Sequence, residues 1–419
     1  MLRLRHLPLR YRLPLIHKGL EWLAKRRSVH WPKASGRDGL KAGDFVVSVF
    51  FNESLGIGRA GRLSAKAFAD AGFSIQQHDL RPAFRRFLSG GADLPGNGGV
   101  WYIHANPPEL LVALMAHSPK AWGNRYRIGY WAWETPLAPE LWAWAADYLH
   151  EIWVPSHYVR DAVAAACLAE GRKDLTLRLR VMPHPVPIPT LLGHGERNAA
   201  RESFGLQPRL TEVLSMFDTK SSAVRKNPWG SVDAWTTAFP QSAETARLTL
   251  KVSDLDSDRT TAQRLGKILA DRDDIRLFAD RLSDAEMDSF VAGFDLLISL
   301  HRSEGFGLPL AEAMAAGVPV IATEGTGNGD FMTAKNARLV PAHPVRIKDV
   351  DGPYTGLERD PRQVWSDPDI DAAARALREL VDSYKTRKAL GEAGREAIHD
   401  LHKPWRTAAL AGLPFNAWI

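Results

Sequence analysis

Residues 294–323 constrain the fold of this chain more than any other segment. They read FDLLISLHRSEGFGLPLAEAMAAGVPVIAT. Residues 296–300 form a short apolar run that suits a strand buried on both faces. Gly305 and Gly307 permit a tight turn, and Pro309 suits the first position of a helix. The segment therefore predicts a strand, a glycine turn, a helix and a second strand, as in a parallel α/β sheet.

The predicted helix start is suited to binding an anion. A helix that begins at the carboxyl end of a parallel strand presents unpaired N–H groups and a partial positive charge. Those N–H groups would come from the turn itself: Gly305, Phe306, Gly307 and Leu308. Two carboxylates flank the turn, Glu304 before the helix and Glu312 inside it. A phosphate at such a helix end needs no further acid, so we expect both glutamates to face hydroxyl groups. Phosphate and hydroxyls together suggest a nucleotide-sugar.

Length and composition describe an ordinary globular protein of more than one domain. A chain of 419 residues is too long for one typical core, which predicts two domains. The single cysteine, Cys167, excludes an internal disulfide and fits a reducing compartment. No apolar run is long enough for a transmembrane helix. The net charge of +6 favours an anionic partner such as a nucleotide, a lipid or a nucleic acid.

The positive charge is concentrated at the N-terminus. Residues 1–33 hold nine Lys and Arg residues against one acid, Glu21, with leucines and Trp22 interleaved. The apolar residues never run together, so this is not a secretory signal. The segment predicts either contact with an anionic membrane surface or a solvated, loosely docked arm. Three prolines, at positions 8, 14 and 32, are expected to break any long helix. A nucleic-acid-binding interpretation lacks a recognised module.

The first half of the chain carries a second glycine-rich segment. A buried-strand pattern at residues 45–51 is followed by Gly56, Gly58 and Gly61, which spell G-x-G-x-x-G at the start of a helix. Asp79 lies about where a ribose-binding acid would stand. This pattern predicts an NAD-dependent enzyme as the rival interpretation. Gly56 and Gly58 would approach phosphates in either case, or would form only a tight turn.

Several polar residues should gather at one edge of the first sheet. Residues 100–107 and 127–134 read as buried strands, and ligands of parallel sheets bind at the carboxyl ends of strands. His104 and Glu134 both fall there. For Trp131 and Trp133, core packing is favoured over stacking on a sugar.

Two adjacent cations follow the first strand of the second half. Residues 212–217 read as a strand, and Arg225 and Lys226 precede a helix over residues 228–239. An Arg fork and a Lys point charge suit a diphosphate. Further on, residues 372–399 read as one long amphipathic helix.

The spacing of Glu304 and Glu312, with seven residues between them and AMAAGVPVIA after them, resembles the E-x7-E region of retaining glycosyltransferases of the GT4 type. The segments WAWETP and EIWVPS resemble a branch that acts in bacterial surface-polysaccharide synthesis. The resemblance implies the GT-B fold, two Rossmann-like parallel-sheet domains facing across a cleft. It also implies transfer of a hexose from a nucleotide-sugar to a saccharide or lipid-linked acceptor, with retention at the anomeric carbon.

The resemblance also implies roles for individual residues. Glu312 would hold the ribose, Glu304 the hydroxyls of the donor sugar, and Lys226 the diphosphate. Arg225 is a less direct match, because Ser221 occupies the usual arginine position. Glu134 stands where a histidine is expected, so either His104 or Glu134 would contact the sugar. Neither a metal ion nor a separate cofactor is implied, since the nucleotide-sugar is a co-substrate.

These observations define the expected domain boundaries and location. We expect a basic N-terminal arm over residues 1–40, an acceptor domain over 41–189 and a donor domain over 190–399. A proline-rich linker ends the acceptor domain, and a tail over residues 400–419 should pack back toward it. The predicted location is the cytoplasm, or peripherally the inner face of the plasma membrane, with no nucleic-acid partner.

Overall fold

The computed structural model describes residues 7–53, 56–350 and 352–419. The first six residues of the basic N-terminal segment, with Arg3 and Arg5, lie outside the described residues, as do residues 54–55 of the glycine-rich segment. The chain divides into two compact units. The first unit comprises Met1–Pro185 together with His402–Ile419, and the second comprises Val186–Leu401.

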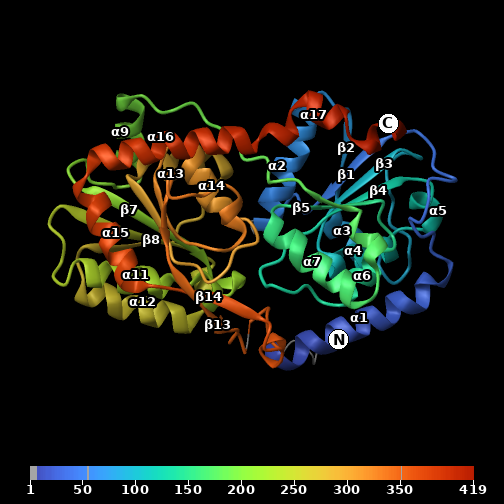
Figure 1. Cartoon of the computed structure of the whole chain (residues 1–419), viewed down its shortest axis with the longest axis horizontal. Helices are drawn as coiled ribbons and strands as arrows, with labels where there is room; N and C mark the ends of the chain where they lie inside the picture. Colours follow the sequence, from blue (N-terminus) through green and yellow to red (C-terminus); the bar gives the residue numbers. More distant parts are fainter. Residues whose placement is uncertain (1–6, 54–55, 351) are drawn as a thin grey trace. The chain divides into compact units, whose positions relative to one another are not determined.

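The first unit contains a six-stranded parallel sheet, drawn in blue to green in Figure 1. Its strand order is β2-β1-β3-β4-β5-β6. The strands are β1 (Phe45–Val49), β2 (Ile75–Asp79), β3 (Val100–His104), β4 (Tyr126–Tyr130), β5 (Glu151–Val154) and β6 (Leu179–Val181). Every residue of β1, β3, β4 and β5 is buried, as expected for apolar strands covered on both faces.

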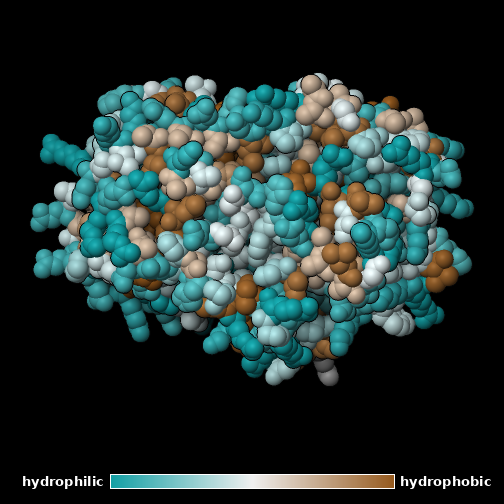
Figure 2. All heavy atoms as spheres, in the orientation of Figure 1, coloured by the Kyte–Doolittle hydropathy of each residue, from teal (hydrophilic) through white to brown (hydrophobic). Residues whose placement is uncertain are grey.

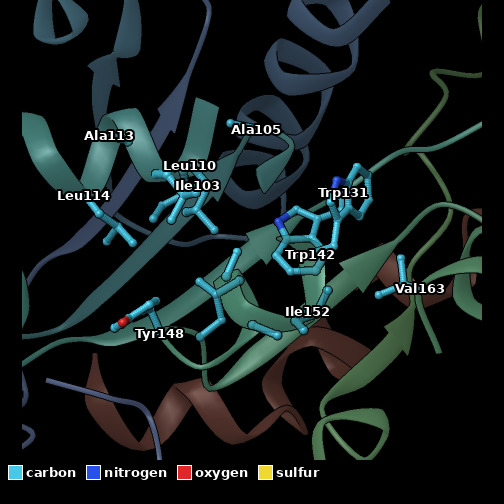
Figure 3. Packing of buried hydrophobic residues seen from close by; sticks show 14 of the residues in the cluster. Ile103, Ala105, Leu110, Ala113, Leu114, Trp131, Trp142, Tyr148, Ile152 and Val163 are labelled. Atoms are coloured by element: carbon cyan, nitrogen blue, oxygen red, sulfur yellow. The ribbon is translucent and has the colours of Figure 1, made fainter. Parts of the chain in front are cut away.

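Helices surround this sheet. They are α1 (Leu9–Arg27), α2 (Gly56–Asp70), α3 (Leu80–Phe84), α4 (Pro107–Ala116), α5 (Pro119–Trp122), α6 (Leu141–Ala146), α7 (His157–Ala169), α8 (Lys173–Thr176) and α17 (Thr407–Ala411). Figure 3 shows the core that α4, α6 and α7 build with β3 to β5. Trp131 is fully buried there, with its ring 5.3 Å from that of Trp142 in an edge-to-face contact. The expectation that Trp131 packs in the core is confirmed.

The last residues of the chain belong to the first unit. Trp405 donates a hydrogen bond from its indole nitrogen to the carbonyl of Pro183 at 2.5 Å. Leu410 and Phe415 are fully buried in the cluster that contains Phe45 and Phe68. His402–Ile419 therefore complete a core that the first part of the chain begins.

The second unit contains another six-stranded parallel sheet, in the order β12-β11-β10-β7-β8-β9. Its strands are β7 (Thr211–Asp218), β8 (Ala246–Ser253), β9 (Ile275–Phe278), β10 (Leu296–Ser299), β11 (Val320–Thr323) and β12 (Arg338–Val340). The helices are α9 (His194–Ser203), α10 (Ala223–Lys226), α11 (Pro228–Ala238), α12 (Arg259–Asp271), α13 (Asp284–Gly293), α14 (Leu308–Ala315), α15 (Ile370–Asp382) and α16 (Tyr384–Leu401). β10, α14 and β11 confirm the strand, helix and strand predicted for residues 294–323.

One prediction about the end of the second unit is wrong. The single helix expected over residues 372–399 is two helices, because Ser383 ends α15 and its hydroxyl accepts a hydrogen bond from the Thr386 N–H at 3.2 Å. Before α15 lies a hairpin that the sequence reasoning missed. β13 (Ala342–Arg346) and β14 (Val364–Pro368) form an antiparallel hairpin, joined by a loop that follows β13.

The expectation that prolines prevent a long N-terminal helix is also wrong. α1 runs for 19 residues with Pro14 inside it, after Pro8 at its N-cap. A single internal proline removes one backbone hydrogen bond, and packing of the helix offsets that loss. Leu20 and Leu23 pack against the core of the first unit, and Ala24 is fully buried in it. Among the described helices, none is long and apolar enough to cross a membrane.

Candidate functional site

The predicted cations lie on a tight turn after β7. The chain passes through a short 3-10 helix and the single turn α10, which ends at Lys226, before α11 begins. Ser222 and Asn227 bracket α10 with φ angles of 66° and 47°, values that non-glycine residues seldom adopt. Such backbone persists only where the surroundings fix it, and it is frequent at functional sites. Here the Asn227 side chain donates to the carbonyl of Leu300 at 2.8 Å, which ties the turn to the end of β10.

A residue from the hairpin loop also holds this turn. The Ser222 hydroxyl donates to the Asp349 carboxylate at 3.0 Å and accepts from the N–H of Arg225 at 3.2 Å. The other oxygen of Asp349 accepts from the N–H of Tyr354 at 3.1 Å. The Tyr354 ring lies 5.7 Å from the guanidinium carbon of Arg225, within cation–π range. Sequence reasoning missed this support, because Ser222 and Asp349 are 127 positions apart.

Arg225 and Lys226 meet Glu304, as the predicted site requires. The Lys226 ammonium lies 2.5 Å from one oxygen of Glu304, and the Arg225 guanidinium lies 3.4 Å from the other. Arg225 is 4% exposed and also donates to the carbonyl of Ser303 at 2.8 Å. Burial alone would raise the pKa of Glu304, but the charges of Lys226 and Arg225 outweigh it and lower the pKa to about 2. Glu304 is therefore ionised at neutral pH.

The glycine turn beside Glu304 is built as predicted. Gly307 has a φ of 94° and precedes α14, whose second residue is Pro309. Within the described residues no side chain caps this helix. Glu312 is half-buried in the second turn of α14.

A second loop, residues 326–328, holds this turn in place. The N–H of Gly327 donates to the carbonyl of Glu304 at 2.8 Å. A Cβ on Gly327 would come within 2.1 Å of the Gly305 carbonyl oxygen, so only glycine permits this approach. The Thr326 hydroxyl accepts from the N–H of Glu304 at 3.3 Å and donates to the Asn328 side chain at 2.7 Å. These contacts fix the backbone that carries Glu304.

His301 is a site residue that the sequence reasoning missed. It follows β10, is fully buried, and has both ring nitrogens without a hydrogen-bond partner among the described residues. Burial lowers its pKa to about 4, despite the opposing effect of Glu304, so the ring is neutral at pH 7. A buried polar side chain without partners is costly and is often retained for function. The only sequence feature that pointed to His301 as a site residue was its position three residues before Glu304.

The first unit places His104 and Glu134 at one edge of its sheet. His104 ends β3 and pairs in register with Tyr130, the last residue of β4, four residues before Glu134. His104 is 2% exposed, its ring is stacked 4.4 Å from that of Tyr130, and its Nδ1 lies 3.2 Å from the Tyr102 hydroxyl. Burial holds the pKa of His104 well below its usual value. Glu134 is half-buried.

The glycine triplet of the first unit serves packing. Gly56, Gly58 and Gly61 all lie within α2. A Cβ on Gly58 would come within 2.4 Å of the Glu53 carbonyl oxygen, and one on Gly61 within 2.8 Å of the Val49 Cβ. Asp79 caps α3 by accepting from the N–H of Arg81 at 3.0 Å. Close helix packing thus accounts for two of the glycines, and a local cap for the acid.

The described part of the chain holds no group of three His, Cys, Asp or Glu side chains arranged to bind a metal ion. Asp254 and Asp367, each the first residue of a D-x-D spacing of the kind that can hold a metal ion, are engaged in local contacts. Asp254 pairs with Lys220 at 3.0 Å, and Asp367 pairs with Arg302 at 2.6 Å.

Solved structures share the fold of this chain at low sequence identity. Anabaena HepE in complex with UDP-glucose has a TM-score of 0.56 at 13% identity, over 87% of this chain and 88% of that protein. A glycosyltransferase from Rickettsia africae has a TM-score of 0.59 at 13% identity, over 88% and 96%. WaaG, a glycosyltransferase involved in lipopolysaccharide biosynthesis, has a TM-score of 0.53 at 15% identity, over 87% and 98%. These likenesses confirm the predicted GT-B fold with its two parallel sheets.

The family follows from the sequence itself. Residues 182–411, more than half of the chain, match the family described as family 4 glycosyltransferases in conflict systems, and the chain belongs to it. No curated protein matches the chain. The resemblance drawn from the E-x7-E region is thereby confirmed, and the protein is a glycosyltransferase. The NAD-dependent alternative gains no support from the family.

Proposed function

We propose that this glycosyltransferase moves a hexose from a nucleoside diphosphate sugar to an acceptor hydroxyl, with retention at the anomeric carbon. The observation that carries the proposal is the cluster of Arg225, Lys226 and Glu304 beside the start of α14. Cations and helix N–H groups stabilise a diphosphate leaving group, and a fixed carboxylate accepts hydrogen bonds from sugar hydroxyls. HepE, whose fold is similar, was crystallised with UDP-glucose and with UDP and glucose.

In this proposal each residue has a separate role. Arg225 and Lys226 hold the diphosphate together with the backbone of residues 305–308. Glu304 positions the sugar, and Glu312, half-buried on α14, holds the ribose. The cations supply the positive charge on their own, so the reaction needs neither a metal ion nor a separate cofactor.

The donor must change the contacts within this cluster. Lys226 is paired with Glu304 at 2.5 Å, so a diphosphate that attracts the ammonium would compete with the carboxylate for it. Release from Lys226 would free one oxygen of Glu304 for a sugar hydroxyl, while Arg225 stays close to the other. Binding of the phosphates would in this way prepare Glu304 for the sugar.

The candidate residues of the first unit differ in the surroundings that this unit gives them. Of the two candidates for the sugar, Glu134 is the better supported because it is half-buried, whereas His104 is enclosed by aromatic rings. Gly56 and Gly58, in the first turn of α2, are proposed to approach a phosphate. We place the reaction in the cytoplasm or at the inner face of the membrane.

The acceptor is proposed to be a saccharide or a lipid-linked saccharide of a surface polysaccharide. The support is the WAWETP segment and the likeness in fold to WaaG, which is involved in lipopolysaccharide biosynthesis. The apolar side chains that α1 exposes, Tyr11, Leu15 and Trp22, independently favour an acceptor at a membrane.

The test is a screen of nucleotide-sugars with the purified full chain. We expect one donor to be hydrolysed or transferred, with the nucleoside diphosphate released, and we expect Glu304→Ala and Lys226→Ala to abolish this turnover while remaining folded. Lys267→Ala, on the exposed side of α12, is the matched control and should keep full activity. Wild-type rates in either site variant would overturn the assignment. A shift in melting temperature with NADH and with no nucleotide-sugar would favour the dehydrogenase alternative.

A further inference from the structure

The N-terminal helix is fixed to the first unit along one side. Leu20, Leu23 and Ala24 face the core of that unit. The Arg27 guanidinium at the end of α1 donates to the carbonyls of Phe87 and Leu88. α1 is therefore an integral helix of the described fold, and its orientation on the first unit determines which side chains face outward.

The opposite side of α1 carries a second apolar stripe. Tyr11, Leu15 and Trp22 are 55%, 56% and 62% exposed. With about 100° between successive residues of a helix, their positions fall within about 40° of one another and point away from Leu20 and Ala24. Packing within the first unit does not account for these three side chains, because they contribute little to its core. Tyr11 and Leu15 are one turn apart and Trp22 lies two turns beyond Leu15 on the same side, and exposed apolar side chains grouped in this way can mark a contact surface.

Cations border this stripe. α1 contains six Lys and Arg residues and one acid, Glu21, which pairs with Lys25 at 2.6 Å. The Arg10 guanidinium lies 5.0 Å from the Tyr11 ring, and the Arg26 guanidinium lies 5.6 Å from the Trp22 ring. In Figure 2, hydrophilic and hydrophobic atoms alternate along the lower right margin, where Figure 1 places α1. The outward face thus combines aromatic and aliphatic side chains with a net positive charge.

We propose that the outward face of α1 binds the surface of an anionic lipid bilayer. A helix with this composition lies in the interface, with its aromatic side chains at the level of the headgroups and its cations on the lipid phosphates. The bilayer would thus contact both the apolar side chains and the cations of this face. A nucleic acid would engage only the cations and leave Leu15 in water, and a second copy of the chain would bring another net positive helix against this one. The inference does not depend on glycosyl transfer, since binding is measured without a donor.

The experiment is co-sedimentation of the full chain with vesicles of phosphatidylcholine alone and of phosphatidylcholine mixed with anionic phosphatidylglycerol. We expect binding to the anionic vesicles only, and weaker binding as salt is added. Replacing Tyr11, Leu15 and Trp22 with serine should weaken this binding by more than about tenfold, because each apolar side chain that leaves water contributes to it. The matched control replaces Leu168 and Leu177, exposed leucines elsewhere in the same unit, and should bind as the wild type does.

Four outcomes would overturn the proposal. The first is no binding to anionic vesicles by the folded wild type. The second is unchanged binding by the triple serine variant, with a wild-type melting temperature that shows it is folded. The third is that the triple variant loses a concentration-dependent dimer while its vesicle binding stays intact. The fourth is that the chain binds RNA or DNA more strongly than it binds anionic vesicles at equal salt.

Discussion

The ion pair between Lys226 and Glu304 should be strongly coupled, because both members are largely shielded from water. The pKa of Glu304 falls from an ordinary 4.5 to about 2 in spite of its burial. A difference of about 2.5 pKa units corresponds to ~3 kcal/mol of preference for the ionised carboxylate. Lys226 supplies the larger part, since its 2.5 Å contact is shorter than the 3.4 Å contact of Arg225.

We therefore predict the outcome of a double-mutant cycle with Lys226→Met and Glu304→Gln. Each single change should lower the free energy of unfolding by about 2 to 3 kcal/mol, because each leaves a buried charge without its partner. The double variant should lose far less than the sum, which gives a coupling energy of about 2 kcal/mol. Differential scanning calorimetry of the wild type and the three variants measures this coupling energy. It is read from the unfolding transition whose temperature changes in both single variants.

The same cycle on an exposed pair is the control. Lys388 and Glu392 lie 3.9 Å apart on α16, with 62% and 69% of their side chains exposed. Their coupling should fall below about 0.5 kcal/mol. The ionised Glu304 contributes its stability above its unfolded pKa and loses it as the pH falls toward 2, so the coupling of the buried pair should be the same at pH 7 and pH 6. A buried-pair coupling no larger than that of the exposed pair would refute the reasoning.

Three further predictions concern the surroundings of this pair. His301→Leu should raise the free energy of unfolding by about 1 kcal/mol, because it removes a buried ring whose two nitrogens have no partner among the described residues. The same change should reduce turnover. A melting temperature below that of the wild type would contradict the first expectation. Asp349→Ala releases Ser222 and the turn that carries the cations, so it should lower the free energy of unfolding by about 1 to 2 kcal/mol. It should also raise the KM for the donor more than it lowers kcat. An unchanged KM in steady-state kinetics would count against this role of Asp349. The folded pKa values of His184 and His301 are about 3 and about 4, below the unfolded value near 6.5. The free energy of unfolding should therefore be highest above pH 6.5 and fall as the pH decreases toward 4, by about 3 kcal/mol for His301 alone. A melting temperature that does not change with pH over this range would exclude this.

The parts of the fold that were predicted correctly are those that local chemistry determines. In β10, α14 and β11 the apolar runs, Gly307 and Pro309 specify a strand, a turn and a helix within thirty residues. The buried strands β1, β3, β4 and β7 were found in the same way, since buried parallel strands are short and largely apolar, whereas β2, β6 and β12 were not predicted. The meeting of Arg225 and Lys226 with Glu304 follows from adjacent strands, because β7 and β10 pair in the sheet.

The parts that were missed depend on distant contacts. β13 contains Pro344 and is only partly buried, so it lacks the pattern of a strand, and the hairpin is recognisable only with β14 beside it. The tie between Asp349 and Ser222 has no local signature. α1 contains Pro14 and would be a poor helix in isolation, and tertiary packing of Ala24 and its neighbours stabilises it.

Calorimetric titration of the full chain with UDP, GDP and ADP and their sugars tests the central claim most directly. The proposed function predicts that one nucleoside diphosphate and its sugar bind at one site per chain, and that Lys226→Met weakens both by about tenfold or more, because a buried charge-assisted contact to phosphate is lost. Lys267→Met, the exposed control, should bind as the wild type does. Equal affinity in Lys226→Met, or binding of NADH with no binding of any nucleoside diphosphate, would contradict the assignment of this site.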